Sequence, residues 1–282
     1  MNDVEFYLED LKSKFEKINS KEYALSYSGG KDSHFLYWFI KNYLNDTDFE
    51  IVGVNTRMEH PDISKRIHRN CDVVLLPQYK PHEVMEKYGT PLLNKSHDDF
   101  IGRYQRGSRA KSTMMYIEGT RNNGESWFKL PKKYVKPLLN NELPKVSNKC
   151  CHYLKKKPMA DYQKKTGKKF ILGVRGNESL LRSTQYKGCF TKDGKFTPLW
   201  DLSGDLLEKI YKHYNIEIPP VYNHLSRTGC MGCPYGKEVE TDLQIMTDNQ
   251  YNYVLRLFKQ SYDIKGINYD RLPHEIKILG GN

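Results

Sequence analysis

The chain has 282 residues, with 45 basic against 34 acidic side chains and a formal net charge of +11. Its hydrophobic content of 38% and aromatic content of 12% suffice for a packed core, which excludes a chain that is disordered throughout. No run of eighteen apolar residues occurs and the first residues are acidic, so we expect no membrane span and no secretory signal. We therefore expect a soluble, cytoplasmic α/β protein in a reducing compartment, where cysteines serve as metal ligands or reactive thiols.

Apolar residues at helical spacing over residues 4–18 predict an amphipathic helix at the start of the chain. Buried strands follow, separated by helical stretches such as the one over residues 33–44. The predicted strands are residues 23–27, 50–55, 72–76 and 170–174. This alternation predicts an α/β fold, a parallel twisted sheet sandwiched by helices and joined by right-handed crossovers.

Between these strands the segment from about 77 to 144 is rich in proline and has no regular period. We expect an irregular insertion on the substrate side, built from short helices. Further helices are predicted near Cys151, ending near Thr166, over 205–214 with Ser203 as a cap, and over 249–262. The expected domains are a nucleotide-binding domain over 1–240, which carries the insertion, and a C-terminal helical extension over 241–282.

Residues 26–33, Ser-Tyr-Ser-Gly-Gly-Lys-Asp-Ser, end the first predicted strand and open a helix. Glycines allow positive φ and a close approach to a ligand, and the first amides of a helix favour an anion. Lys31 adds a positive charge, and Asp32 is a candidate ligand of Mg²⁺. The expected nucleotide-binding residues of this loop are Ser26, Ser28, Gly29, Gly30, Lys31, Asp32 and Ser33. The spacing differs from the Walker A motif, G-x-x-x-x-G-K-(S/T).

A second motif, Gly-Val-Arg-Gly-Asn-Glu-Ser-Leu-Leu-Arg over residues 173–182, follows the fourth predicted strand. Its two arginines, Arg175 and Arg182, are suited to clamp a phosphate or sulfate, with Glu178 orienting one of them. A surface ion pair is the alternative interpretation. We also predict Gly173 and Asn55 as nucleotide-binding residues, Asn55 through hydrogen bonds to adenine or ribose.

Four cysteines form two pairs, Cys150–Cys151 and the C-x-x-C of Cys230 and Cys233. Together they make a four-thiolate set suited to a [4Fe–4S] cluster or, less favoured, to zinc. A C-x-x-C alone is also found as a redox dithiol. Adjacent side chains diverge on a helix and on a strand, so Cys150 and Cys151 reach one cluster only where the backbone kinks.

Two further cysteines are interpreted differently. Cys189 is an alternative fourth ligand or a free thiol that carries sulfur, whereas Cys71 is expected in the core. We interpret His34, His152 and His224 as packing or surface residues rather than as catalytic groups.

The sequence of residues 28–33 resembles the SGGKDS signature of PP-loop enzymes, which include N-type ATP pyrophosphatases, tRNA thiolation enzymes and sulfonucleotide reductases. Residues 173–182 resemble the G-(I/V)-R-x-x-E-S-x-x-R pattern of the phosphoadenosine phosphosulfate (PAPS) reductase-like family. Residues 197–201 and 227–236 extend the match, which covers about 20–240. The Cys-Cys and C-x-x-C pairs resemble the cluster site of APS reductases and of relatives in phages and DNA-sulfur-modification systems.

This resemblance implies an adenine nucleotide alpha hydrolase-like, Rossmann-like fold. It implies cleavage of ATP between its α and β phosphates, or binding of an adenylyl sulfate. The predicted catalytic residues are Lys31, Asp32, Arg175 and Arg182. Sulfonucleotide reductases carry a nucleophilic cysteine in their tail, whereas this chain has no cysteine after Cys233 and ends in residues 272–282 without one.

We therefore favour ATP-dependent adenylylation with Mg²⁺, coupled to sulfur transfer through the cluster and supplied by a sulfur-donor protein. The alternatives are a sulfonucleotide reductase that uses Cys189, and a non-catalytic nucleotide- or nucleic-acid-binding module with a structural metal. Residues 145–169 hold nine lysines and one acid, Asp161, and predict a nucleic-acid substrate. A solvated helix face is the alternative for this basic region.

Overall fold

The computed structural model describes residues 2–46, 48–121, 124–178 and 180–271, with only the backbone described at 178, 180 and 181. By its contacts the chain forms two units. The first comprises Met1–Pro77 and Lys157–Thr228, and the second comprises Gln78–Lys156 and Gly229–Asn282. The expected boundary at residue 240 is not a unit boundary here, because the chain leaves the first unit after Pro77 and returns to it at Lys157.

A parallel sheet forms the centre of the first unit. Its strands are β1 (Tyr23–Tyr27), β2 (Glu50–Val54), β3 (Val73–Leu75) and β6 (Lys169–Leu172), in the order β3-β2-β1-β6. Every neighbouring pair is parallel, with Leu25 aligned to both Ile51 and Ile171. Each observed strand lies within two residues of its prediction, because continuous apolar runs are typical of strands buried on both faces.

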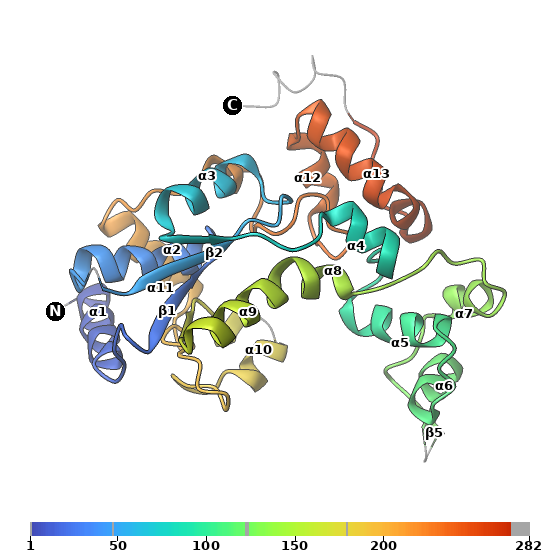
Figure 1. The fold of residues 1–282 in the computed structure, drawn as a ribbon, viewed down its shortest axis with the longest axis horizontal. Helices are drawn as coiled ribbons and strands as arrows, with labels where there is room; N and C mark the ends of the chain where they lie inside the picture. Colours follow the sequence, from blue (N-terminus) through green and yellow to red (C-terminus); the bar gives the residue numbers. More distant parts are fainter. Residues whose placement is uncertain (1, 47, 122–123, 179, 272–282) are drawn as a thin grey trace. The chain divides into compact units, whose positions relative to one another are not determined.

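Helices cover both faces of this sheet, as predicted (Figure 1). On one face α9 (Lys157–Thr166) places Tyr162 against Phe170 at a ring distance of 5.7 Å, beside buried Ala24 and Val52. On the other face α3 (Pro61–Asn70) joins Tyr27, whose hydroxyl accepts a hydrogen bond of 2.8 Å from the Asn70 amide. The fold class is therefore a parallel sheet flanked by helices.

The predicted helices over 4–18, 33–44 and 205–214 are present in this unit within three residues of their predicted bounds, and further short helices accompany them. Ser203 caps α11, as predicted, by accepting a hydrogen bond from the amide of Leu206 at 3.1 Å. The predicted helix over 33–44 consists of α2 followed by a π-helical turn, η1. These elements are α1 (Asp3–Phe15), α2 (Lys31–Trp38), η1 (Phe39–Tyr43), η3 (Gly176–Glu178), α10 (Leu180–Gln185), α11 (Gly204–His213) and η4 (Pro220–Asn223).

The second unit is mostly helical, and its predicted short helices are present. Pro81 is compatible with its helix because it stands in the first turn, where no backbone N–H is needed, whereas Pro137 lies inside a helix. Leu92, Ile101 and Tyr116 belong to the core of this unit. Its elements are α4 (Pro81–Tyr88), α5 (Lys95–Gln105), α6 (Lys111–Glu118), β4 (Thr120–Arg121), β5 (Gly124–Glu125), α7 (Lys132–Leu139), α8 (Lys149–Cys151), η2 (His152–Lys156), α12 (Val239–Ile245) and α13 (Asp248–Lys265).

Crossing a membrane requires a helix that is both long and apolar. Over the described ranges, none of the helices meets both requirements.

Candidate functional site

The loop between β1 and α2 is held in shape by its own hydroxyl groups. Ser33 Oγ accepts a hydrogen bond from the Ser28 amide at 3.2 Å and donates one to the Gly30 carbonyl at 3.1 Å. The hydroxyls of Ser28 and Ser33 lie 3.0 Å apart. Gly29 adopts the expected positive φ of 75°, but Gly30 is extended at −76° as the N-cap of α2, so one left-handed residue makes the turn.

The backbone of Lys31 forms hydrogen bonds with two tyrosines that sequence patterns do not predict as site residues. Its backbone amide donates to the Tyr222 hydroxyl at 3.1 Å, and its carbonyl accepts from the Tyr211 hydroxyl at 2.7 Å. The Lys31 ammonium lies 4.5 Å from the centre of the Tyr222 ring, a cation–π contact. Tyr222 is itself held by Thr228, with 3.1 Å between their hydroxyl oxygens. The Tyr222 hydroxyl thus accepts the hydrogen bond of the Lys31 amide, which would otherwise be available to an oxyanion.

The two motifs predicted for nucleotide binding meet at the first turn of α2. Arg175 Nε donates to Asp32 Oδ1 at 2.7 Å, and the two side chains are 17% and 19% exposed. Gly173 packs so closely that a β-carbon there would lie 2.8 Å from the Ser33 nitrogen and 2.9 Å from the Asp32 carbonyl carbon. A side chain at position 173 would push the loop aside, so this position requires glycine.

Two further arginines, Arg182 and Arg227, lie near the Arg175–Asp32 ion pair. Burial lowers the pKa of Arg182, Arg227 and Arg175 lower it further, and Asp32 acts in the opposite direction. Arg227 was not singled out as a site residue, although it belongs to the 227–236 match. Three guanidinium groups and one lysine near one carboxylate make this region suited to an anion with several charges.

The other predicted nucleotide residues differ in how far the structure describes them. Ser26 lies on β1 and is partly buried. Asn55 bonds within the protein, its amide nitrogen 2.9 Å from His68 Nε2 and its oxygen accepting from the Arg57 amide at 2.8 Å. The side chain of Glu178 lies outside the described part of the chain.

A buried histidine lies one position beyond the loop. His34 Nδ1 is 2.9 Å from the Tyr27 hydroxyl, and burial together with the charge of Arg66 lowers the pKa of His34 to about 3. It is therefore neutral and packed, as predicted. His152 and His224 are exposed.

All four paired cysteines lie in the second unit, and they act on one another electrostatically. Cys150 is buried, and its pKa is raised by a hydrogen bond with Cys151, by burial, and by Cys233 and Cys230. The pKa of Cys151 is lowered to about 6, chiefly by that hydrogen bond and then by the charges of lysines. These lysines are Lys95, Lys155 and Lys156.

The turn between Cys230 and Cys233 is fixed by α12 and α13. Gly232, at φ +60°, donates its amide to Asp242 Oδ2 at 2.8 Å and accepts at its carbonyl from the Tyr262 hydroxyl. A β-carbon at position 232 would lie 2.2 Å from Val254 Cγ1. Burial raises the pKa of Cys233 to about 12. The second thiol pair is therefore held by a close-packed turn.

Across the described residues, no three side chains from His, Cys, Asp and Glu are arranged as ligands of one metal ion. The donor chemistry itself fits a cluster, since thiolate sulfur is its usual ligand and lysines act electrostatically on Cys151.

Cys189 and Cys71 both lie in the first unit. Cys189 acts electrostatically on the hydroxyl of Tyr7 on α1. Cys71, expected in the core, is only partly buried, since it follows the last turn of α3, although its sulfur lies against Gly53. Burial raises its pKa to about 12.

The predicted basic region over 145–169 is divided between the two units. Two of its lysines are paired with carboxylates, Lys157 with Asp161 at 2.7 Å and Lys168 with Glu50 at 2.9 Å. The charge available to a partner is smaller than the composition indicates.

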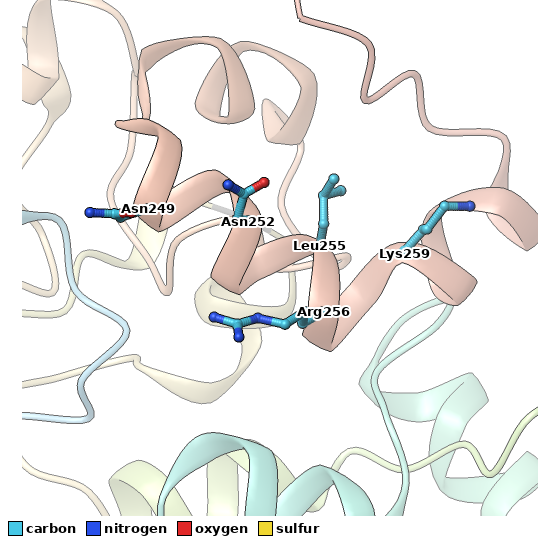
Figure 2. A pocket seen from close by; sticks show the side chains of 5 residues that line it. All are labelled: Asn249, Asn252, Leu255, Arg256 and Lys259. Carbon is cyan, nitrogen blue, oxygen red and sulfur yellow. The ribbon is translucent and has the colours of Figure 1, made fainter.

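A surface hollow lies far along the sequence from these motifs, on α13 alone (Figure 2). Its lining residues are Asn249, Asn252, Leu255, Arg256 and Lys259. It contains none of the predicted site residues, and one exposed helix face does not enclose a ligand.

No protein-family model and no curated protein matches the chain. Among solved structures, an NAD⁺ synthetase from Burkholderia pseudomallei is 13% identical, with 91% of this chain and 89% of that chain covered and a TM-score of 0.39. The U34-tRNA thiolase NcsA from Methanococcus maripaludis, solved with its [4Fe–4S] cluster, is 14% identical. That match covers 93% of this chain and 78% of the thiolase, with a TM-score of 0.35. An NMN synthetase from Francisella tularensis is 13% identical, with 96% of this chain and 97% of that chain covered and a TM-score of 0.36. Likenesses of this size establish no shared function.

Proposed function

We propose that the chain is an ATP-using PP-loop enzyme of the PAPS reductase-like kind, which couples adenylylation to iron–sulfur-dependent sulfur transfer. The observation that carries this proposal is the meeting of two motifs 143 residues apart, through the Arg175–Asp32 ion pair. A glycine loop, a lysine and arginines around one helix start are the groups that a phosphate chain requires.

In the proposed reaction an oxygen of the acceptor attacks the α-phosphorus of ATP. A bond forms between that oxygen and phosphorus, the bond to the bridging oxygen of the β-phosphate breaks, and pyrophosphate leaves. Lys31 and the loop amides stabilise the charge on the leaving group. Arg175 and Arg182 hold the remaining phosphate oxygens, and Asp32 is the residue that would hold Mg²⁺.

Binding requires a local rearrangement of the ligand-free loop. Arg175 must share its guanidinium between Asp32 and phosphate, and the Tyr222 hydroxyl must release the Lys31 amide. Both contacts are made by side chains, so the loop backbone itself need not refold. The structure thus supports a preformed turn whose donors are covered by exchangeable partners.

Cys150, Cys151, Cys230 and Cys233 of the second unit would hold a [4Fe–4S] cluster. When bound, such a cluster would supply the iron–sulfur chemistry for transfer of sulfur from a donor protein. Sulfide-level sulfur would then attack the carbon that bears the adenylylated oxygen; a carbon–sulfur bond forms, the carbon–oxygen bond breaks, and the oxygen leaves with AMP. The protein's part is to fix the Cys230–Cys233 turn through Gly232 and to balance negative charge with nearby lysines.

The test is pyrophosphate release from ATP and Mg²⁺ with candidate RNA or DNA acceptors, under anaerobic conditions. Lys31→Ala should lower the rate about 100-fold, the usual cost of removing one preorganised charge donor. Lys21→Ala is the matched control, because Lys21 is an exposed lysine of the same unit. Equal rates for the Lys31→Ala and wild-type chains would contradict the proposal.

A further inference from the structure

Three tyrosines form a partly exposed aromatic platform in the second unit. The rings of Tyr88 on α4 and Tyr153 on η2 are stacked, 4.4 Å apart and 14° from parallel. Tyr79 meets Tyr153 edge-on at 6.0 Å. We call these three residues the tyrosine platform. Tyrosine rings on a surface rather than in a core offer flat faces on which another ring can stack.

Lysine side chains lie beside this platform. The Lys87 ammonium lies 5.2 Å from the ring centre of Tyr79 and 5.5 Å from that of Tyr88. Lys145 donates to the Lys87 carbonyl at 2.6 Å, and Lys149 acts electrostatically on the Tyr153 hydroxyl. The aromatic faces and the positive charges are therefore at one place.

Acidic residues are scarce in the sequence around Lys145 and Lys149. From 143 to 160 the chain has no acidic residue. On α4, Glu83 accepts the Lys80 amide at 2.5 Å as part of the helix cap, and Glu86 is exposed. The local excess of positive charge favours a polyanion over an apolar or basic partner.

The platform is also close to the thiols along the chain. Tyr153 follows Cys151 by two residues in a continuous helical stretch, and α4, which carries Tyr88, packs against α8, which carries Cys150 and Cys151. A ring stacked on the platform would therefore be brought to the neighbourhood of the paired cysteines.

We propose that the tyrosine platform binds single-stranded nucleic acid, with a base stacked on the tyrosines and phosphates held by Lys87, Lys145 and Lys149. Stacking on tyrosine together with lysine contacts to phosphate is the general chemistry of single-strand binding. The inference rests on the proposed function only where it assigns the bound nucleic acid as the acceptor of adenylylation and sulfur transfer. It also narrows the nucleic-acid surface from the whole of 145–169 to one defined place.

The experiment measures binding of fluorescein-labelled oligo(U) and oligo(dT) to the full-length chain by anisotropy, without ATP and at several salt concentrations. Tyr153→Ala should weaken binding about tenfold, and Tyr153→Phe, which keeps the ring, should bind within about twofold of the unmodified chain. Lys149→Ala should lower the slope of log affinity against log salt by about 0.7.

Tyr253→Ala is the matched control, because Tyr253 is a partly buried tyrosine beside Arg256 on α13 and should leave binding unchanged. A preference for oligo(U) or for oligo(dT) identifies RNA or DNA as the acceptor. No loss in Tyr153→Ala, or an equal loss in Tyr253→Ala, would overturn the platform. Pyrophosphate release is measured separately. If no pyrophosphate is released but oligonucleotides still bind, the proposed function fails while the assignment of the tyrosine platform holds.

Discussion

The two units build their candidate sites in different ways. In the first unit the loop at residues 26–33 is shaped by neighbours in sequence, through Ser28, Ser33 and the start of α2. In the second unit the Cys230–Cys233 turn is shaped by residues further along the chain, Asp242, Val254 and Tyr262. The turn of the loop is thus closed by its own hydroxyl groups, although Arg175 and Tyr222 contact it from 143 and 191 residues away. The cysteine turn instead depends for its shape on side chains that follow it in the chain.

The comparison is sharpest at Gly232. Gly232→Ala places a methyl group 2.2 Å from Val254 Cγ1 at φ +60°, so we expect a loss of about 3 kcal/mol in the free energy of unfolding. Thermal unfolding and iron content after anaerobic purification measure the effect. The unmodified chain should hold about four irons, and the variant clearly fewer.

Gly266 provides the matched control for that substitution. It has φ +79°, but no atom lies within 4 Å of a β-carbon there, so Gly266→Ala should cost only about 1 kcal/mol and retain iron. Equal effects of the two substitutions would mean that backbone strain, not packing of the cysteine turn, determines the result.

An effect of similar size is expected from acid at His34 in the first unit. The pKa of His34 is about 3 in the folded chain and 6.5 in the unfolded chain. The unfolded chain therefore binds more protons than the folded chain between pH 3 and pH 6.5. The stabilisation is complete above pH 6.5 and is lost as pH falls toward 3, by at most about 1.4 kcal/mol per pH unit. Urea unfolding from pH 7 to 4 measures this slope.

His34→Asn removes the titrating group and should flatten the acid dependence of stability. His152→Asn, at an exposed position, should leave the slope as it is in the unmodified chain. An unchanged slope in His34→Asn would show that other groups cause the acid sensitivity.

The smallest effect is expected at Tyr222. Tyr222→Phe keeps the ring beneath the Lys31 ammonium but removes the hydroxyl that accepts the Lys31 amide. Pyrophosphate should then bind about threefold more tightly, which corresponds to roughly 0.7 kcal/mol for one released hydrogen bond. Isothermal titration calorimetry measures the dissociation constant.

Tyr43→Phe is the control for Tyr222, because its hydroxyl bonds to Glu9 at 2.6 Å, away from the loop. Weaker pyrophosphate binding in Tyr222→Phe would indicate that the hydroxyl contacts the ligand instead of competing with it.

Local patterns predicted much of this molecule. The four strands, the Ser203 cap and the helix after the loop follow from apolar runs and capping residues. Gly29 was assigned its turn correctly, but Gly30 was not, because one left-handed residue suffices to end β1 and begin α2.

The remaining features depend on contacts across long stretches of sequence. Tyr222 reaches Lys31 from 191 residues away and Tyr211 from 180, and no local pattern marks either tyrosine. The division into two units likewise depends on where the chain re-enters the sheet, which composition does not reveal. Arg175 was predicted to bind phosphate, but its partner Asp32 could not be read from spacing.

The strand order β3-β2-β1-β6 has a consequence for evolution of the chain. From β1 the chain builds outward to one side through β2 and β3, and it then returns to the opposite side of β1 at β6. The segments after β1 and after β6 therefore diverge at a topological switch point, where open parallel sheets bind their ligands. Since the excursion from residue 78 to 156 departs beyond the edge strand β3, it can lengthen or diversify without altering that switch point.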